Sequence, residues 1–324
     1  MSRGLEFASR WFRRFAQLGA VGFSLAMIFG WFSSVHTAFD SFSTFRMFFG
    51  SGLLAALLVL LLYRRWAWVL GGMAVVAVSL ILTMPNLPGM KRGWAVAGAP
   101  PLEGKPTLRV AQANILWMVQ DHSETAQVLL NSAPDVIVLQ EVAQANRQIL
   151  DLLTPTHPHI LDCTPDRWHS VAIASRFPFD AEFEPSCPPP GGLGLVHIEM
   201  GEKTINIGSF HAWWPWPRSQ NYQLDIYTEV LSQLRGPSLV GGDFNASPWS
   251  NAVARMAASF GGQVPSGLAM TWQPGGLVSW LPKWPLLSLD HMLHTADFGL
   301  VSREVLPSGR SDHHPVVSEY VLLN

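Results

Sequence analysis

The chain has 324 residues, 48% of them hydrophobic, and its formal net charge of −2 hides an uneven distribution. Residues 1–100 contain nine lysines and arginines against two acidic residues, a net charge of +7, whereas residues 101–324 contain twelve against 21, a net charge of −9. Two regions of different character therefore meet near residue 100. The acidic balance of the second region argues against a dedicated nucleic-acid-binding enzyme, because such proteins neutralise phosphates with lysine and arginine.

Residues 1–88 are predicted to form a membrane domain. Three uncharged stretches, Phe15–Val35, Met47–Tyr63 and Trp66–Met84, are each about long enough to cross a hydrocarbon core of roughly 30 Å. A cleaved signal peptide would account for one such stretch, and buried helices of a soluble protein for one or two. We therefore expect three transmembrane helices in contact with the lipid bilayer.

The basic residues of this domain predict its orientation. Four arginines precede the first stretch and two lie between the second and the third, whereas the first loop has one arginine that Asp40 offsets. The six arginines are Arg3, Arg10, Arg13, Arg14, Arg64 and Arg65. The positive-inside rule then predicts a multi-pass protein of the inner (plasma) membrane with an extracytoplasmic catalytic domain, although Lys91 and Arg92 weigh against this orientation.

Residues 89–106 are rich in Gly, Ala and Pro and are predicted to be a linker, and residues 107–324 are enough for one globular domain. Cys163 and Cys187 are the two cysteines of the chain. They could pair in an oxidising compartment or remain separate buried thiols, and their spacing does not decide between these alternatives.

Strand-like and helix-like segments alternate in residues 107–324, which predicts an α/β domain with at least one large sheet. The expected strands are Thr107–Ala113, Val136–Leu139, Ser170–Ala174, Leu193–Met200, Thr204–Phe210, Ser238–Gly241, Leu287–Leu293, Leu300–Val305 and Pro315–Leu322. Helices are expected from about Asp121 to Ser132, over Gln144–Leu153, around Leu224–Leu234 and from about Ser250.

Polar side chains recur at the ends of these apolar strands. The clearest case is Val240–Trp249, where two glycines follow a strand and precede Asp243 and Asn245. The other polar residues are Asn114, Glu141, His211, Asp290, Asp312 and His313. Singly, each has an ordinary structural explanation as a turn former, a helix cap or a buried histidine. Polar groups gathered at one rim of a sheet are typical of a ligand site, so together they favour chemistry.

The order of these residues resembles that of the endonuclease/exonuclease/phosphatase superfamily, whose members include pancreatic deoxyribonuclease, the apurinic endonucleases, neutral sphingomyelinases and inositol polyphosphate phosphatases. The resemblance covers about residues 107–322 and rests on the order and spacing of several short motifs. These are Asn114, Gln140-Glu141, Ser175–Pro178, Phe210-His211, Gly242–Asn245, Leu289–His291 and Ser311–His313. It implies a four-layer α/β sandwich, in which two face-to-face β-sheets are flanked by helices.

The resemblance also implies a divalent metal, Mg²⁺ or Mn²⁺. Glu141 would bind it, with Asn114 beside it and Asp312 near the metal or its waters. Oxygen ligands of this kind suit a hard cation. Whether one or two metals bind is left open.

The remaining motif positions carry over to the hydrolysis of a phosphoester by an activated water. Asp243 would orient or deprotonate the water, Asn245 would bind a phosphate oxygen, and His211 would hydrogen-bond the phosphoryl group. His313 would pair with Asp290, which fixes its tautomer and raises its basicity. Either His313 or Asp243 remains a candidate for the general base.

Tryptophans next to these motifs bear on the substrate. Trp213, Trp214 and Trp216 follow His211 directly, and with Arg176 they are the candidate substrate-binding residues. A second aromatic run extends from Trp272 to Leu287. The tryptophans could pack in the core, contact a membrane or lipid, or stack on single-stranded nucleic acid.

The expected function is thus a membrane-anchored, Mg²⁺-dependent phosphoesterase that acts on a phosphate mono- or diester, with a lipid-linked substrate at the outer face of the membrane as the favoured case. The alternatives are an extracytoplasmic endo- or exonuclease and a catalytically inactive membrane-bound binding module. Substrate class and oligomeric state do not follow from the sequence.

Overall fold

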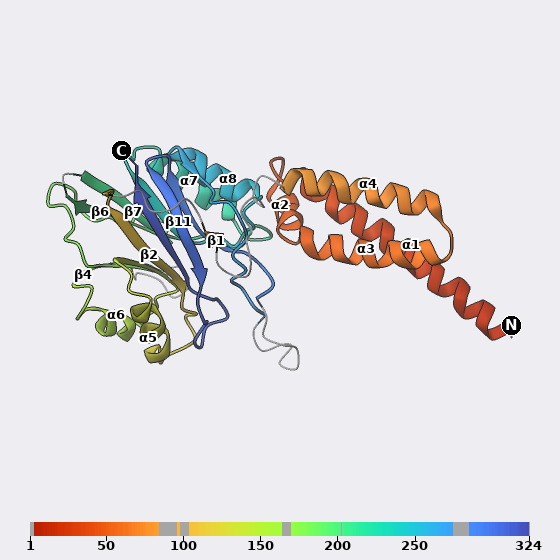
Figure 1. Ribbon diagram of the computed structural model, residues 1–324, viewed down its shortest axis with the longest axis horizontal. Coiled ribbons are helices and arrows are strands. Elements are labelled where there is room, and N and C mark those ends of the chain that lie inside the picture. The colour runs from red at the N-terminus through yellow and green to blue at the C-terminus, as the bar shows by residue number, and fades with distance from the viewer. Residues whose placement is uncertain are drawn as a thin grey trace. The chain divides into compact units, whose positions relative to one another are not determined.

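The computed structural model describes residues 3–83, 96–97, 104–163, 170–201, 203–274 and 285–323 (Figure 1). Most of the expected linker, and Trp280 and Trp284 of the second aromatic run, lie outside these residues. The chain divides into two compact units, residues 1–85 with 249–251 and residues 86–248 with 252–324.

The first unit is helical. Its helices are α1 (Arg3–Trp31), α2 (Thr37–Thr44), α3 (Arg46–Leu62) and α4 (Trp66–Thr83). Among the described residues, α4 is the single helix that is long and apolar enough to cross a membrane by itself, and α2 with α3 passes as a pair bent by 61°. The expectation of three spans is therefore not confirmed: α1 does not pass as a span, and α3 has 17 residues.

Small residues and one buried cation hold this unit together. A Cβ at Gly72 would lie 2.6 Å from the Leu57 side chain, so the glycine lets α4 approach α3 closely. Arg46 is 5% exposed, and its Nη2 donates to Gly30 O at 3.1 Å and to Ser43 Oγ at 3.1 Å. The guanidinium thus satisfies a carbonyl in the last turn of α1, which would otherwise lack an intrahelical partner.

The second unit contains two mixed β-sheets. Sheet A has the strand order β1 (Val96–Ala97), β11 (Phe298–Val305), β12 (Val316–Leu322), β2 (Thr107–Asn114), β3 (Val136–Gln140), β5 (Val171–Ser175) and β4 (His159–Cys163). Sheet B has the order β6 (Leu193–Met200), β7 (Lys203–His211), β8 (Ser238–Asp243), β10 (Asp290–Thr295) and β9 (Gly262–Gln263). One pair in each sheet is parallel, β2 with β3 and β7 with β8.

The two sheets pack face to face, and helices cover their outer faces (Figure 1). Alternate residues of β2 show this division: Leu108 and Val110 pack against sheet B, whereas Ala111 and Ala113 pack against helices. The helices on sheet A are α5 (Ser123–Asn131) and α6 (Gln148–Leu153), and those on sheet B are α7 (Gln220–Leu231) and α8 (Asn251–Ser259). The predicted sandwich of two sheets flanked by helices is confirmed.

A disulfide joins Cys163 to Cys187, with an S–S distance of 2.00 Å. Cys163 ends β4, an edge strand of sheet A, and Cys187 follows Ser186, which bridges to Leu195 of β6, an edge strand of sheet B. The cysteine pairing that the sequence left open is therefore present, and it links the two sheets along one side.

Candidate active site

The strands of the sandwich carry polar residues at one end of the face between the sheets. In β2 the positions on this face are Leu108 and Val110, followed by Gln112 and Asn114. In β7 they are Ile205 and Ile207, followed by Ser209 and His211. On this face, each strand thus carries apolar side chains along most of its length and polar side chains at its C-terminal end.

The strand pairings bring these ends together. Asn114 is opposite Gln140 in the parallel pair of β2 and β3, and His211 is opposite Asp243 in the parallel pair of β7 and β8. β10 runs antiparallel to β8, so its first residue, Asp290, is opposite Asp243. A strand beginning and several strand ends therefore meet at the same edge of the sandwich.

A glycine sets the spacing of β7 and β8 at this edge. Gly242 has φ 156°, and a Cβ on it would lie 1.8 Å from the carbonyl oxygen of Phe210. Any side chain there would push the two strands apart. The glycine before Asp243 is thus required for the close approach of Asp243 to His211.

Asn114 connects the two sheets at the centre of the site. Its Nδ2 donates to Glu141 Oε1 at 3.0 Å and to Asp243 Oδ2 at 3.0 Å, while its Oδ1 accepts from Leu116 N. The amide therefore presents donors to both carboxylates, while its oxygen accepts one backbone N–H. The assignment of Asn114 to the metal group stays a prediction.

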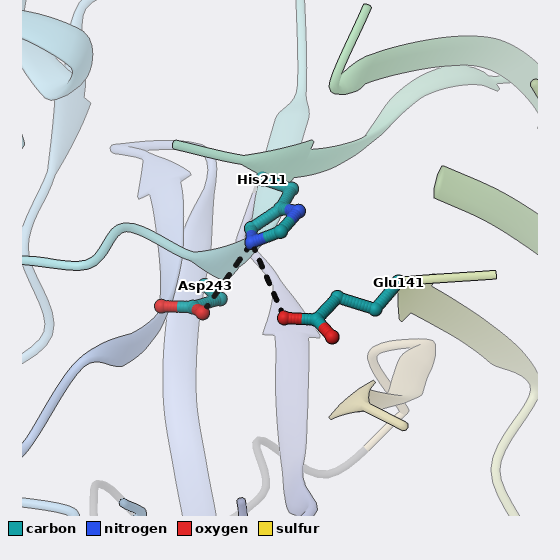
Figure 2. A group of neighbouring side chains, drawn as sticks. All are labelled: Glu141, His211 and Asp243. Atoms are coloured by element: carbon teal, nitrogen blue, oxygen red, sulfur yellow. Dashed lines mark ion pairs between the residues drawn. The ribbon is translucent and has the colours of Figure 1, made fainter. Parts of the chain in front are cut away.

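His211, Glu141 and Asp243 face one another across the mouth of the sandwich (Figure 2). His211 Nε2 lies 3.7 Å from Glu141 Oε1 and 3.7 Å from Asp243 Oδ2. Glu141 also accepts a hydrogen bond from Trp117 N at 2.9 Å, and its φ of 61° is unusual for a residue other than glycine. Such strained backbone is common at functional sites.

The second histidine of the site is held by a carboxylate. His313 Nδ1 lies 2.8 Å from Asp290 Oδ2, so the two residues that were predicted to pair do so. Its Nε2 faces Asp243, with 3.7 Å between Nε2 and Oδ2. Asp290 Oδ1 in turn accepts from Gln112 Nε2 at 2.7 Å, which fixes the carboxylate from the opposite sheet.

The environment separates the protonation states of these groups. Burial raises the pKa of Asp243 to about 7. Burial, with the nearby His313, lowers the pKa of His211 to about 3. Burial alone would lower the pKa of His313, but the carboxylates of Asp290 and Asp243 raise it to about 10. At neutral pH, therefore, His313 is charged, whereas His211 is neutral and its contacts with Glu141 and Asp243 are not full ion pairs.

A cavity of about 310 Å³ opens over this cluster. Its lining residues are Trp117, Glu141, His211, Ala212, Trp214, Arg218, Asp243, Asn245, Trp272, Asp312 and His313. Asn114 and Asp290 are not among them, so they act on the lining residues from behind. The cavity thus combines carboxylates, imidazoles and aromatic rings in one polar recess.

The donor set fits a hard divalent cation. Glu141, His211 and Asp243 each offer a ligand atom, and these atoms lie within 4.8 Å of one another. Asp312 lines the same cavity, and its buried Oδ1 has no hydrogen-bond partner among the described residues. Carboxylate oxygens are the ligands that Mg²⁺ prefers, so Glu141 and Asp243, with Asp312 nearby, would hold such an ion.

The sequence model of the Endonuclease/Exonuclease/phosphatase family matches residues 111–313. The chain belongs to this family. Members of the family are metal-dependent hydrolases of phosphoester bonds, so the protein is a hydrolase that acts on ester bonds. Members of the family use Mg²⁺, and the carboxylates and imidazole of the cavity suit this expected cofactor. No curated protein matches the chain.

Solved structures share the fold. TDP2 from D. rerio, complexed with a single-strand DNA product, has a TM-score of 0.53 and 17% identity, over 66% of this chain and 98% of that one. An endonuclease/exonuclease/phosphatase from Beutenbergia cavernae has a TM-score of 0.50 and 20% identity, over 67% and 72%. Beta toxin from Staphylococcus aureus has a TM-score of 0.50 and 16% identity, over 65% and 99%. At these identities the likeness concerns the fold alone.

Most of the family's motif positions meet at the cavity. The structure brings together Asn114, Glu141, His211, Asp243, Asn245, Asp290, Asp312 and His313. Asn245 lines the cavity, but its Nδ2 donates to Ala212 O at 2.7 Å and its backbone N–H to Asp243 Oδ1 at 2.8 Å. It therefore supports the carboxylate of Asp243 as well as facing the cavity.

Of the four candidate substrate-binding residues, one lines the cavity and three do not. Trp214 lines the cavity, Trp213 stacks on Tyr222 with 6.5 Å between the ring centroids, and Trp216 is 58% exposed and outside the lining set. Arg176 does not reach the site. Arg176 follows β5, which runs antiparallel to β3. It therefore lies beside Asp135 and Val136, where β3 begins, whereas Glu141 follows the other end of β3. Its assignment to the substrate is therefore wrong.

Three residues of the site were not singled out from the sequence. Arg218 lines the cavity from the loop after His211, and Trp117 lines it from the loop after Asn114. Gln112 acts behind Asp290. The loops themselves were visible as continuations of the motifs, whereas nothing local distinguishes Gln112 from an ordinary polar residue of a strand.

Proposed function

We propose that the protein is a membrane-anchored, Mg²⁺-dependent phosphoesterase that hydrolyses a phosphate mono- or diester outside the cytoplasm. Hydrolysis is inferred mainly from the position of Asp243. This residue lines the cavity between His211 and His313 and accepts a hydrogen bond from Asn114. A carboxylate and two imidazoles around one open recess provide an acceptor for the proton of water and donors for a phosphoryl group.

The chemistry assigns a part to each side chain. A water oxygen attacks phosphorus, its proton passes to Asp243, and the bond from phosphorus to the leaving oxygen breaks. His313, charged and aligned by Asp290, passes a proton to the leaving oxygen, and neutral His211 donates a hydrogen bond to a phosphoryl oxygen. When bound by Glu141 and Asp243, Mg²⁺ would offset the negative charge that develops on the phosphoryl oxygens.

Several features support the membrane anchor and the outer location. α4 is long and apolar enough to span a bilayer, and α2 with α3 is a second candidate. The arginines before α1 and between α3 and α4 favour an N-terminus in the cytoplasm. A disulfide between Cys163 and Cys187 is typical of an oxidising compartment.

A lipid-linked substrate is supported by the rim of the cavity. Trp214 lines the cavity and is 40% exposed, while Trp216, Tyr222 and Met118, on or beside the two loops that border it, are each more than half exposed. Tryptophan and tyrosine favour the interface between water and hydrocarbon. A loop of this composition suits a substrate presented at a membrane surface.

An extracytoplasmic nuclease is the second candidate. Exposed tryptophans also stack on bases, and one protein of the same fold has been solved with a single-strand DNA product. The net charge of −9 on residues 101–324 weighs against a long nucleic acid, because few cations are present to neutralise phosphates.

The experiment is a substrate panel with the purified full chain in detergent. Lipid phosphates in vesicles, soluble phosphodiesters, phosphomonoesters and plasmid DNA are tested with Mg²⁺ and with EDTA. We expect Mg²⁺-dependent turnover of a lipid phosphate, no turnover with EDTA, and loss of turnover in Glu141→Ala. Comparable hydrolysis of DNA with no lipid activity would select the nuclease. Binding without turnover of any phosphoester would select the inactive module.

Location is tested separately. A reporter that is active only outside the cytoplasm, fused after Asn324, should be active, and a reporter that is active only in the cytoplasm should be silent. The reverse pattern would rule out the proposed orientation and leave the hydrolytic assignment standing.

A further inference from the structure

One cation stands out in the cavity. Arg218 is the single lysine or arginine among the lining residues that the structure describes, whereas Glu141, Asp243 and Asp312 are acidic. Within the described part of the chain, the Arg218 side chain makes no ion pair with these carboxylates or with any other residue. A guanidinium that shares a recess with carboxylates and remains unpaired is available to a ligand with negative charge.

The loop that carries Arg218 is fastened to the sandwich. Trp213 N donates to Gln223 Oε1 at 2.8 Å, and Trp213 O accepts from Gln220 Nε2 at 2.6 Å. Gln223 also donates to His211 O at 2.9 Å. The two glutamines of α7 therefore fix the backbone of His211 and Trp213, where the loop that carries Arg218 begins, which reduces the entropy that a ligand would lose on ordering this part of the loop.

Aromatic rings line the same recess. Trp117, Trp214 and Trp272 come from three separate loops. Trp272 Nε1 donates to Asp312 Oδ2 at 3.3 Å, so the Trp272 ring is held by an acidic residue, and the backbone of Trp117 is held by its N–H, which donates to Glu141 Oε2 at 2.9 Å. Flat apolar surfaces held in this way suit the carbon skeleton of a small ligand rather than its charges.

We propose that the cavity binds substrates with two phosphate groups, one at Asp243, His211 and His313 and the other at Arg218, with the tryptophans along the group that joins them. This deepens the proposed function and rests on it for the identity of the first phosphate site. Arginine recognises phosphate through paired N–H donors. A volume of about 310 Å³ is at the small end for ligand cavities, which favours a compact head group over a polymer.

Binding of non-hydrolysable ligands tests the second phosphate site directly. The probes are propylphosphonate and propane bisphosphonate with a phosphonate at each end, titrated calorimetrically into the full chain in detergent with Mg²⁺. We expect the wild-type chain to prefer the bisphosphonate, and Arg218→Ala to weaken the bisphosphonate roughly 10- to 100-fold while changing the monophosphonate little.

The matched control is Arg235→Ala. Arg235 lies outside the cavity, and its guanidinium donates to Ser232 O and Leu234 O in its own turn, so its loss removes one positive charge without touching the recess. The control should keep the wild-type preference. Equal weakening of both phosphonates in Arg218→Ala, or no weakening of either, would overturn the proposal.

Hydrolysis then identifies the source of the two phosphates. Phosphatidylglycerol phosphate and phosphatidylglycerol in vesicles form the lipid pair, and para-nitrophenyl glyceryl phosphate with and without a second phosphate forms the soluble pair. A preference for the two-phosphate member that is lost in Arg218→Ala supports the proposal, and the pair that shows it names the source. An equal loss on both members of both pairs overturns it.

The two proposals fail in different ways. If the bisphosphonate binds through Arg218 but no phosphoester is hydrolysed with Mg²⁺, the hydrolytic function falls and the second phosphate site stands. If phosphoesters are hydrolysed but Arg218→Ala affects one-phosphate and two-phosphate compounds alike, the second phosphate site falls and the function stands.

Discussion

The helical unit and the α/β unit treat apolar side chains in opposite ways. In the helical unit Leu18, Leu62 and Leu70 are 68%, 76% and 68% exposed, whereas in the α/β unit Leu108 and Val138 are fully buried between the sheets. An apolar exterior is stable only in apolar surroundings, and an apolar interior is what water requires. This difference in exposure supports the proposed membrane anchor of the first unit.

Buried charge follows a different rule in the two units. The helical unit buries Asp40 and Arg46, of opposite sign, and Arg46 is hydrogen-bonded to neighbouring helices. The α/β unit buries Asp243 at the wall of a cavity, and Asp290, of the same sign, behind it. A buried charge with internal partners holds a structure together, whereas one that faces an open recess is poised for a ligand.

Asp243→Ala should have the largest effect and act on the second unit alone. We expect hydrolysis to fall by about 1000-fold or more, because both the acceptor for the proton of water and a metal ligand are lost. The domain should remain folded, because burial opposes ionisation of this carboxyl, as its raised pKa shows, and this offsets the loss of the hydrogen bonds from Asn114 and Asn245. Steady-state kinetics and thermal unfolding of the purified full chain measure the two effects.

The control for this variant is Asp225→Ala. Asp225 is exposed on α7 and pairs with Arg255, 2.6 Å between Oδ1 and Nη2. Its loss should leave hydrolysis unchanged. Substantial activity in Asp243→Ala would remove Asp243 from the chemistry and with it the contrast between the two kinds of buried charge.

Arg46→Ala should have the second largest effect and act on the first unit. Removing one member of a buried, hydrogen-bonded set leaves the others without partners, so we expect the helical unit to lose roughly 3 kcal/mol of stability. Hydrogen exchange should quicken in α1, α2 and α3 while hydrolysis per folded molecule stays the same. Arg65→Ala, an exposed arginine of the same unit, is the control. Equal exchange in both variants would show that Arg46 has no structural part.

His157 predicts a smaller effect that depends on pH. The residue is buried near Pro134, and burial lowers its pKa below the ordinary value of 6.5. The folded chain then binds fewer protons than the unfolded chain, so the stability from neutral His157 is complete above about pH 6.5 and is lost as the pH falls below it. The thermal midpoint should fall less steeply on acidification in His157→Gln than in the wild type. Identical slopes would contradict this.

The sequence predicted the parts of the fold that depend on local pattern. Val136–Gln140 is fully buried and uniformly apolar until its last residue, and such a run followed by a carboxylate indicates a strand end at a site. β4 was missed because His159–Cys163 is an edge strand of mostly half-buried residues with no clear alternation. α6 begins at Gln148, four residues later than expected, because a turn occupies the preceding residues.

What the sequence could not provide is the direction in which strands pair. Arg176 follows β5 just as Glu141 follows β3. Because these two strands pair antiparallel, however, the two residues lie at opposite ends of the strand pair. Gln112 was equally invisible, because its partner Asp290 lies 178 positions further along the chain. The motifs located the residues of the site, and only the three-dimensional pairing shows which of them support the others from behind.

The hydrogen bonds between the sheets have a consequence for how the protein matures. Gln112 to Asp290 and Asn114 to Asp243 join residues 178 and 129 positions apart, and each bond links a strand of sheet A with one of sheet B. Contacts between such distant positions form late, since the loop-closure entropy must first be overcome. A nascent or half-folded chain would therefore be inactive. The rate at which activity returns during refolding would report the rate at which the two sheets pack together.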